Sequence, residues 1–198
     1  MRLLLASRSA TRSRLLRAAA VPFEIRASDV DEMPLRNRLE AAGVAAEEAA
    51  LTLARAKAKQ IARLEPEDTL VLGCDQILLF RGRFAGRPRD LEAARRQLRE
   101  LRGARHELVS AAVLLRESQE CWHTVEKARL WMRPFSEDFL DAYLTTLGER
   151  VTATVGGYEL EGPGIQLFER IEGDFFAILG LPLLSLLEAL RAQGYLPR

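Results

Sequence analysis

A carboxylate that directly follows a long apolar run is the first feature of this sequence that points to chemistry. Residues 70–74 are apolar, as in a strand covered on both faces, and Asp75 comes straight after them. Such a carboxylate needs hydrogen-bonding partners or a ligand, because a buried unpaired charge is costly. Asp31 and Glu32 form a second acidic group. These oxygens suit a hard divalent cation, although Asp31 and Glu32 could equally be solvated turn residues.

A second cluster of chemical interest is the polar stretch between the first apolar run and the first helix. Residues 6–12 read A-S-R-S-A-T-R. Free backbone N–H groups at a helix start, together with Ser7, Ser9 and Arg12, are the groups that hold a phosphate. The simpler alternative is that Ser9 only caps the helix and the arginines are solvated. Neither a Walker A sequence nor a G-x-G-x-x-G motif is present to decide the matter.

Two further cations could clamp phosphate groups. Lys57 has alanines on both sides in a helical stretch, which indicates tight packing with the ammonium leaving a crowded face. Arg87 sits between Gly86 and Pro88, in a turn whose backbone is restricted. Taken alone, each is better explained as an ordinary surface cation, since most lysines and arginines are solvated.

Composition limits the classes of partner. Across 198 residues, 29 Lys and Arg nearly cancel 28 Asp and Glu, so no overall field would gather nucleic acid or an anionic membrane. The two cysteines, Cys74 and Cys121, lack the spacing of a zinc site. The chain opens without a secretory leader and has no apolar run of roughly 20 residues. We therefore expect a cytoplasmic protein with no nucleic-acid or membrane partner.

The elements that must position these residues follow from hydrophobic periodicity and capping signals. Residues 28–32 are expected to form an acidic loop, and residues 81–83 a turn. We predict one α/β domain over residues 1–198, with a mixed sheet and helices on both of its sides. Strands are predicted at residues 2–6, 23–27, 70–74 with an extension over 77–80, 108–115 and 124–132, and helices at 10–20, at 45–64, after Asp90, after Ser136 and from Pro182.

Six short motifs in this order resemble those of the Maf family of nucleotide pyrophosphatases, and the resemblance runs along essentially the whole chain. Two departures stand out: Ala10 replaces the usual proline of the first motif, and Arg87 replaces a lysine. The segment ending at Tyr158 also differs from the family's commonest form. The matching motifs are residues 5–12, Asp31 with Glu32, residues 56–58, residues 73–76, residues 86–88 and the closing G-L-P-L of residues 180–183.

The resemblance implies a fold and a set of roles. The implied fold is a twisted mixed sheet with flanking helices and a deep central cleft, as in inosine triphosphate pyrophosphatases. Asp75, Lys57 and Glu32 would be the catalytic residues, with Asp75 as proton acceptor and with Glu32 and Asp75 facing a divalent Mg²⁺ or Mn²⁺. The implied substrate-binding residues are Ser7, Ser9, Arg12 and Arg87, with Lys57 also on the triphosphate.

The family divides by the base of its substrate. Gln76 and Glu161 resemble the branch that acts on 7-methyl-GTP, whereas Thr11 matches neither branch. A guanine edge presents N1–H and N2–H₂ donors that a carboxylate accepts, and N7-methylation makes the ring cationic. We therefore assign Thr11, Gln76 and Glu161 to specificity. Without the resemblance, Glu161 is a turn carboxylate in a glycine-rich loop.

The implied reaction is hydrolysis of the α–β phosphoanhydride of a nucleoside triphosphate, which gives a monophosphate and pyrophosphate. Two alternatives stay open. The enzyme could act on dTTP or UTP, or the protein could be a nucleotide-sensing regulator of cell division without relevant turnover. A homodimer is also left open, as is the preferred metal.

Overall fold

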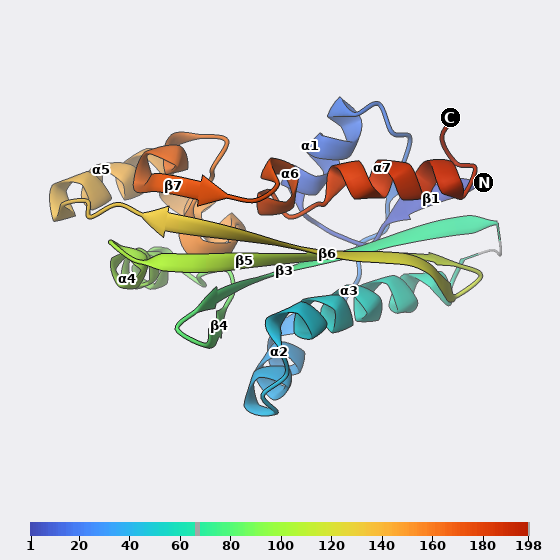
Figure 1. Ribbon diagram of the computed structural model, residues 1–198, viewed down its shortest axis with the longest axis horizontal. Coiled ribbons are helices and arrows are strands. Elements are labelled where there is room, and N and C mark those ends of the chain that lie inside the picture. The colour runs from blue at the N-terminus through green and yellow to red at the C-terminus, as the bar shows by residue number, and fades with distance from the viewer. Residues whose placement is uncertain (66–67, 198) are drawn as a thin grey trace. The chain divides into compact units, whose positions relative to one another are not determined.

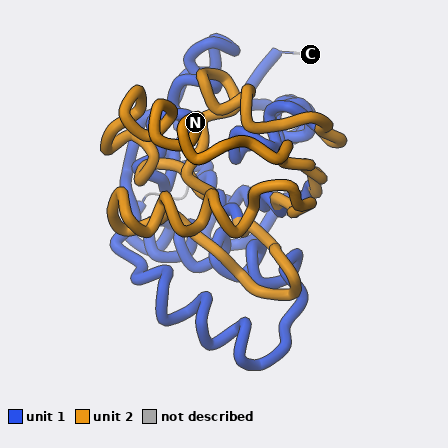
Figure 2. Tube along the Cα trace, turned by 90° about the vertical axis from the view of Figure 1, so that its left-hand side faces the viewer, with its two compact units in different colours: residues 1–76, 109–126, 174–198 blue, residues 77–108, 127–173 orange. Residues whose placement is uncertain are grey.

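The computed structural model describes residues 1–65 and 68–197, and these residues form two compact units. Unit 1 comprises Met1–Gln76, Val109–Glu126 and Asp174–Arg198, and unit 2 comprises Ile77–Leu108 and Lys127–Gly173 (Figure 2). Each unit is thus assembled from segments that lie far apart in the sequence. The expectation of a single domain, with a deep central cleft, stays a prediction.

The strands form the mixed sheet that the sequence predicts. In unit 1, β1 pairs in parallel with β2 and with β3. In unit 2, β4 pairs antiparallel with β3, and β7 pairs antiparallel with β6. The hydrogen-bonding order is β2-β1-β3-β5-β6-β7, with β4 beside β3. Their bounds are β1 Arg2–Leu5, β2 Glu24–Ile25, β3 Thr69–Phe80, β4 Arg83–Ala85, β5 Arg105–Arg116, β6 Gln119–Met132 and β7 Phe168–Glu172.

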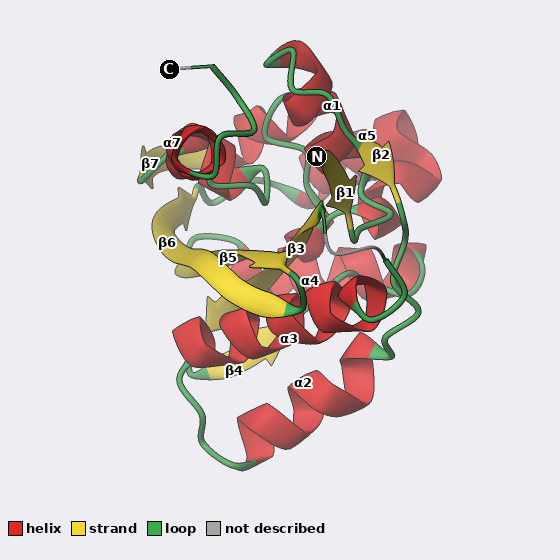
Figure 3. Cartoon of the chain, turned by 90° about the vertical axis from the view of Figure 1, so that its right-hand side faces the viewer, coloured by secondary structure: helices red, strands yellow, loops and turns green. Residues whose placement is uncertain are grey.

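The helices of unit 1 cover both faces of its strands. Figures 1 and 3 both show α1 and α7 on one side of β3 and α3 on the other. Between β3 and the helices α1 and α7 lies a core of aliphatic side chains that includes Leu16, Leu72 and Leu186. This burial is the main force that holds the helices on the sheet. The helix bounds are α1 Ala10–Ala18, α2 Glu32–Ala41, α3 Ala46–Ala62, α6 Phe175–Ile178 and α7 Leu183–Ala192.

Unit 2 contains α4, Leu91–Leu101, and α5, Glu137–Leu147. The predicted caps are present: Asp90 Oδ1 accepts from the Ala93 N–H at 2.6 Å, and Ser136 Oγ accepts from the Phe139 N–H at 3.1 Å. Short 3-10 helices at Gly148–Ala153, Val155–Gly157 and Pro163–Leu167 follow α5. The glycine-rich stretch of the sequence therefore folds into tight turns.

Several elements differ from the sequence prediction. The predicted strand over residues 23–27 shortens to the two residues of β2, and α2, α6 and β7 were not expected. Helix α2 gave no signal because none of its residues is buried, so it lacks an apolar stripe. Helix α6 has only four residues. An element this short or this polar cannot be recognised from periodicity.

Candidate active site

Two carboxylates of unit 1 contact the same lysine ammonium group. Lys57 Nζ on α3 lies 2.5 Å from Asp75 Oδ1 on β3 and 2.8 Å from Glu32 Oε1 on α2. Lys57 and Asp75 are buried, whereas the Glu32 side chain is half exposed. The predicted catalytic residues, separated by 25 and 18 positions in the chain, therefore form one contiguous cluster.

Gly73 allows α3 to lie close enough for this contact. A Cβ at Gly73 would stand 2.3 Å from the Ala54 carbonyl oxygen and 2.8 Å from the Ala58 Cβ. Both alanines are on α3, one turn apart, on the buried side that also carries Lys57. The small residues of helix and strand thus let the two backbones approach, which brings the Lys57 ammonium to the strand.

Asp75 lies within a strand and not at a strand end. The sequence prediction was wrong on this point, because β3 continues without a break to Phe80. Glu32 was expected in a loop, but it is the first residue of α2. A carboxylate in the first turn of a helix interacts favourably with the helix dipole. Asp31 precedes it as an exposed N-cap residue without a side-chain capping bond.

Burial dominates the electrostatics of Asp75. Desolvation raises the pKa of its carboxyl group above the ordinary value, the Lys57 ammonium lowers it, and the Glu32 carboxylate raises it again. The net direction is upward, because a buried carboxylate loses more hydration than one cation returns. A carboxyl group with a raised pKa is a stronger base once it is ionised, which suits proton transfer from water.

The predicted phosphate loop is built around a buried arginine. Arg12 Nε donates to the Gly180 carbonyl at 2.7 Å, and its NH1 donates to the Cys74 carbonyl at 3.1 Å and to Ser7 Oγ at 3.2 Å. Arg12 is only 5% exposed. Its guanidinium ties the loop after β1 to β3 and to the turn before α7. It is not one of the solvated arginines of the simpler alternative.

The two serines of this loop serve the backbone. Ser9 Oγ accepts from the Arg12 N–H at 3.3 Å and so caps α1, as the simpler reading predicted. Ser7 Oγ accepts from the Ser9 N–H at 3.2 Å. Thr11, in the first turn of α1, is half-buried. These bonds fix the loop at the N-terminus of α1, and a role in holding phosphate stays a prediction for all of them.

The acidic stretch before α2 is anchored by a residue that the sequence analysis did not single out. Gln60 Oε1 on α3 accepts from Ser28 Oγ and from the Asp29 N–H, both at 2.8 Å. Ser110, on β5, was also missed, although it is the polar residue within the otherwise apolar stretch 108–115 of that strand. It hydrogen-bonds to Gln76, one of the three predicted specificity residues.

The remaining predicted residues belong to unit 2. Arg87 is exposed in the segment that follows β4, next to the buried Pro88. Glu161 is exposed in the turn between two of the 3-10 helices. Nearby, Tyr158 contacts His106, a buried histidine whose pKa is lowered by desolvation to about 4 and whose Nε2 lies 2.8 Å from the tyrosine hydroxyl.

The chemistry of the donor set fits a divalent cation with the help of a substrate. Glu32 and Asp75 bring two carboxylates to one point. Over residues 1–65 and 68–197, no group of three or more His, Cys, Asp or Glu side chains is arranged to hold a metal. Mg²⁺ is usually bound through one or two carboxylates together with substrate phosphates. Two carboxylates could supply part of the shell of such an ion, and the divalent cation stays a prediction.

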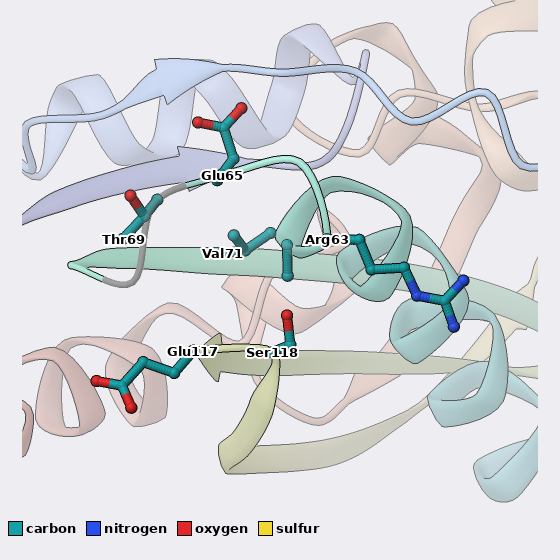
Figure 4. A pocket seen from close by; sticks show the side chains of 7 residues that line it. Arg63, Glu65, Thr69, Val71, Glu117 and Ser118 are labelled. Atoms are coloured by element: carbon teal, nitrogen blue, oxygen red, sulfur yellow. The ribbon is translucent and has the colours of Figure 1, made fainter.

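A cavity of about 230 Å³ in unit 1 lies away from this cluster. Figure 4 shows its lining side chains, which come from the end of α3, the start of β3 and the turn between β5 and β6. Val71, its lining residue nearest to Asp75 along β3, is four positions away, or about 13 Å at the rise of a strand. None of the predicted site residues lines this cavity.

Comparison with known proteins defines the class of this chain. The family model described as "Maf-like protein" matches residues 2–193. The chain is 48% identical to the 7-methyl-GTP pyrophosphatase of Rhizobium meliloti (strain 1021) over 97% of this chain and 96% of that protein. It is 47% identical to the nucleoside triphosphate pyrophosphatase of Granulibacter bethesdensis, over 96% of each chain. A 7-methyl-GTP pyrophosphatase from Rhizobium etli is 44% identical, over 98% and 96%.

This chain therefore belongs to the Maf-like protein family, and the resemblance expected from its motifs is confirmed. A solved structure of a nucleoside-triphosphatase from Mycobacterium abscessus aligns over all of this chain and 98% of its own, with a TM-score of 0.42 and 15% identity. A likeness of that size adds nothing to the assignment. Among the helices of the described residues, none is long and apolar enough to cross a membrane.

Proposed function

We propose that this protein is a nucleoside triphosphate pyrophosphatase that cleaves the α–β phosphoanhydride and releases a monophosphate and pyrophosphate. The observation that carries the proposal is the buried Lys57–Asp75 pair, with Glu32 on the same ammonium, in a member of the Maf-like family. The names of the similar proteins, 7-methyl-GTP pyrophosphatase and nucleoside triphosphate pyrophosphatase, support this reaction.

The roles of the residues follow from their environment. Asp75 accepts a proton from the water that attacks the α-phosphorus, for which a buried carboxylate with a raised pKa is suited. Lys57 holds Asp75 in place and supplies positive charge against the phosphate oxygens that gain charge in the transition state. Arg12, Ser7 and Ser9 shape the start of α1, whose N-terminus offers backbone N–H groups to the triphosphate. Arg87 adds a further cation.

Glu32 and Asp75 are the residues that would hold a divalent cation, Mg²⁺ or Mn²⁺. When bound, such an ion neutralises phosphate charge and polarises the bond to be cleaved. The acidic side chains are hard oxygen donors, and the nearby thiol of Cys74 is packed in the apolar core that contains Leu16 and Leu186. Lys57 contacts both carboxylates, so it would share them with such an ion.

We propose 7-methyl-GTP, or another modified nucleotide, as the preferred substrate. Gln76 and Glu161 carry this assignment, together with the 44–48% identity to two proteins named 7-methyl-GTP pyrophosphatase. A dTTP or UTP pyrophosphatase of the same family is the alternative. We further propose that the enzyme works in the cytoplasm, without a nucleic-acid or membrane partner. A homodimer and a part in regulating cell division are left open.

One assay tests the reaction. Purified protein with Mg²⁺ is given 7-methyl-GTP, GTP, dTTP, UTP and ATP, and both products are identified. Monophosphate with pyrophosphate is the expected pair, whereas diphosphate with orthophosphate would place the attack at the γ-phosphorus and refute the proposal. Asp75→Asn should lower turnover by about 10² to 10⁴, the usual worth of a positioned proton acceptor. Asp29→Asn, which replaces an exposed aspartate of unit 1, is the control.

The base preference has its own test. Glu161→Gln with Gln76→Thr should lower kcat/KM for 7-methyl-GTP relative to UTP by on the order of tenfold, because a charge-assisted hydrogen bond is exchanged for a neutral one. A wild-type enzyme that prefers UTP would move the protein to the pyrimidine branch. An unchanged ratio in the double variant would release both residues from base recognition and leave Thr11 as the next residue to replace.

A further inference from the structure

The side chain of Gln76 is held by three oxygen atoms within unit 1. Its Nε2 donates to Ser110 Oγ at 2.8 Å, to the Ile178 carbonyl at 2.9 Å and to the Ala177 carbonyl at 3.1 Å. Gln76 is on β3, Ser110 is on the neighbouring strand β5, and the two carbonyls belong to α6. The amide is thus fixed from a strand and from a helix at once.

This surrounding sets which end of the amide is nitrogen. The oxygen and the nitrogen of a glutamine amide group are easily confused by shape, but backbone carbonyls can only accept hydrogen bonds. The atom beside the Ala177 and Ile178 carbonyls must therefore be the NH₂ group. The Ser110 hydroxyl donates its hydrogen to the Ala177 carbonyl at 2.7 Å, so its oxygen accepts a hydrogen bond from the Gln76 NH₂ group. Both hydrogens of the amide are thereby used.

The bonds also have a structural purpose, because the last carbonyl groups of a helix lack partners within it. Gln76 and Ser110 supply donors to the end of α6. That purpose accounts for the nitrogen of Gln76 but not for its oxygen. Gln76 is only half-buried, and its Oε1 receives no hydrogen bond from residues 1–65 or 68–197. The group left for a ligand is an acceptor.

We infer that Ser110 is a positioning residue, which together with α6 fixes the Gln76 amide so that Gln76 reads an N–H donor of the nucleotide base through its carbonyl oxygen. This rests on the proposed function and specifies how its base recognition works. A glutamine that is free to rotate offers either a donor or an acceptor. Here the rotation is blocked, since a flipped amide would set its oxygen against the carbonyls of Ala177 and Ile178.

A fixed acceptor at Gln76 distinguishes bases by the hydrogen-bond donors on their edges. Guanine carries N1–H and N2–H₂ donors, and a methyl group at N7 leaves both in place. A fixed acceptor at Gln76 favours such an edge and disfavours a base that offers only a lone pair there. Threonine at this position, as in Gln76→Thr, would lose this acceptor and would also remove the amide donor from the two α6 carbonyls, of which Ala177 keeps the Ser110 hydroxyl.

The experiment removes the base donors one at a time. Values of kcat/KM are measured for 7-methyl-GTP, for its inosine counterpart without the N2 amino group, and for its N1-methylated form. In wild type, kcat/KM for at least one analogue should be lower than for 7-methyl-GTP by on the order of five- to tenfold, which corresponds to the loss of one hydrogen bond. This fall in kcat/KM is the analogue penalty. That penalty should vanish in Gln76→Met and shrink in Ser110→Ala. If the enzyme prefers UTP, 3-methyl-UTP replaces the guanine analogues, because uracil N3–H is the corresponding donor.

Two further variants separate positioning from mere stability. Ser110→Thr keeps the hydroxyl and should keep the penalty. Ser13→Ala removes another buried serine hydroxyl of unit 1, one that bonds to the Ser9 carbonyl at 3.1 Å, and should also keep it. Thermal midpoints are recorded for each protein. A penalty that stays at the wild-type value in Gln76→Met and Ser110→Ala would overturn the inference, as would equal losses on every substrate in Ser110→Ala. Absence of pyrophosphate from every triphosphate in wild type would instead refute the proposed function.

Discussion

Lys57 Nζ and Asp75 Oδ1 lie 2.5 Å apart, and both side chains are almost completely buried. A pair like this is costly to bury but still more costly to break, because the remaining charge is left without a partner in a medium of low polarity. Glu32, half exposed, is the third member of the cluster and the one open to solvent. The cluster therefore has one buried acid, one buried base and one accessible carboxylate.

Lys57→Met should strongly destabilise the protein at neutral pH. Methionine keeps much of the volume, but Asp75 is left buried without its cation, for which about 3–5 kcal/mol is typical. Lys59→Met replaces an exposed lysine of the same helix and should change stability by no more than about 0.5 kcal/mol. Urea denaturation of the two variants measures the difference. Equal stabilities would show that the buried pair contributes nothing to the fold.

The pKa of Asp75 predicts a pH-dependent effect of Asp75→Asn on the metal-free protein. Since the folded-state pKa is raised above 3.8, the folded protein holds this proton more tightly than the unfolded chain. Stability is therefore lost as pH rises from the unfolded-state value to the folded-state value, by up to about 1.4 kcal/mol per pH unit. Asparagine does not titrate, so the variant loses no stability in this way. Its free energy of unfolding should therefore rise relative to that of wild type as the pH rises. If the variant is more stable than wild type at low pH and loses this advantage towards neutral pH, the pKa of Asp75 is lowered and not raised.

Gly73→Ala should disturb the site through packing alone. The added Cβ would meet the Ala54 carbonyl at 2.3 Å, so α3 must move away from β3 and take Lys57 with it. We expect a loss of about 1–3 kcal/mol of stability and a fall in kcat. Ala58→Gly should not rescue the variant, because the nearest atom belongs to the backbone of α3. Full rescue by Ala58→Gly would show that the Ala58 methyl group is the real obstacle.

Metal binding should depend on the nucleotide. Among residues 1–65 and 68–197, two carboxylates, those of Glu32 and Asp75, contact the Lys57 ammonium of the cluster. Mn²⁺ titrated into the protein alone should bind weakly, and addition of a non-hydrolysable triphosphate should tighten binding by at least tenfold, since phosphate oxygens complete the shell. Electron paramagnetic resonance of free Mn²⁺ measures both. Glu32→Gln should weaken the ternary complex, and tight binding without nucleotide would contradict this reading.

Local sequence determined much of the scaffold. The apolar run at residues 70–74 specified a buried strand, and the caps Asp90 and Ser136 specified where two helices begin. Motif order also identified the family that the comparisons confirm. These features can be recognised from neighbouring residues, because periodicity, capping and short motifs are read along the chain.

Tertiary structure alone decided which partners the polar side chains would have. That Lys57 reaches both Glu32 and Asp75 depends on α3 lying against β3, which Gly73 permits. The same holds for Arg12, buried against Gly180, 168 positions away. Ser110 reveals the limit most clearly, because a single serine within the apolar stretch 108–115 gives no hint of the amide it fixes. A side chain's hydrogen bonds are set by what folding places beside it, and that information is spread over the whole chain.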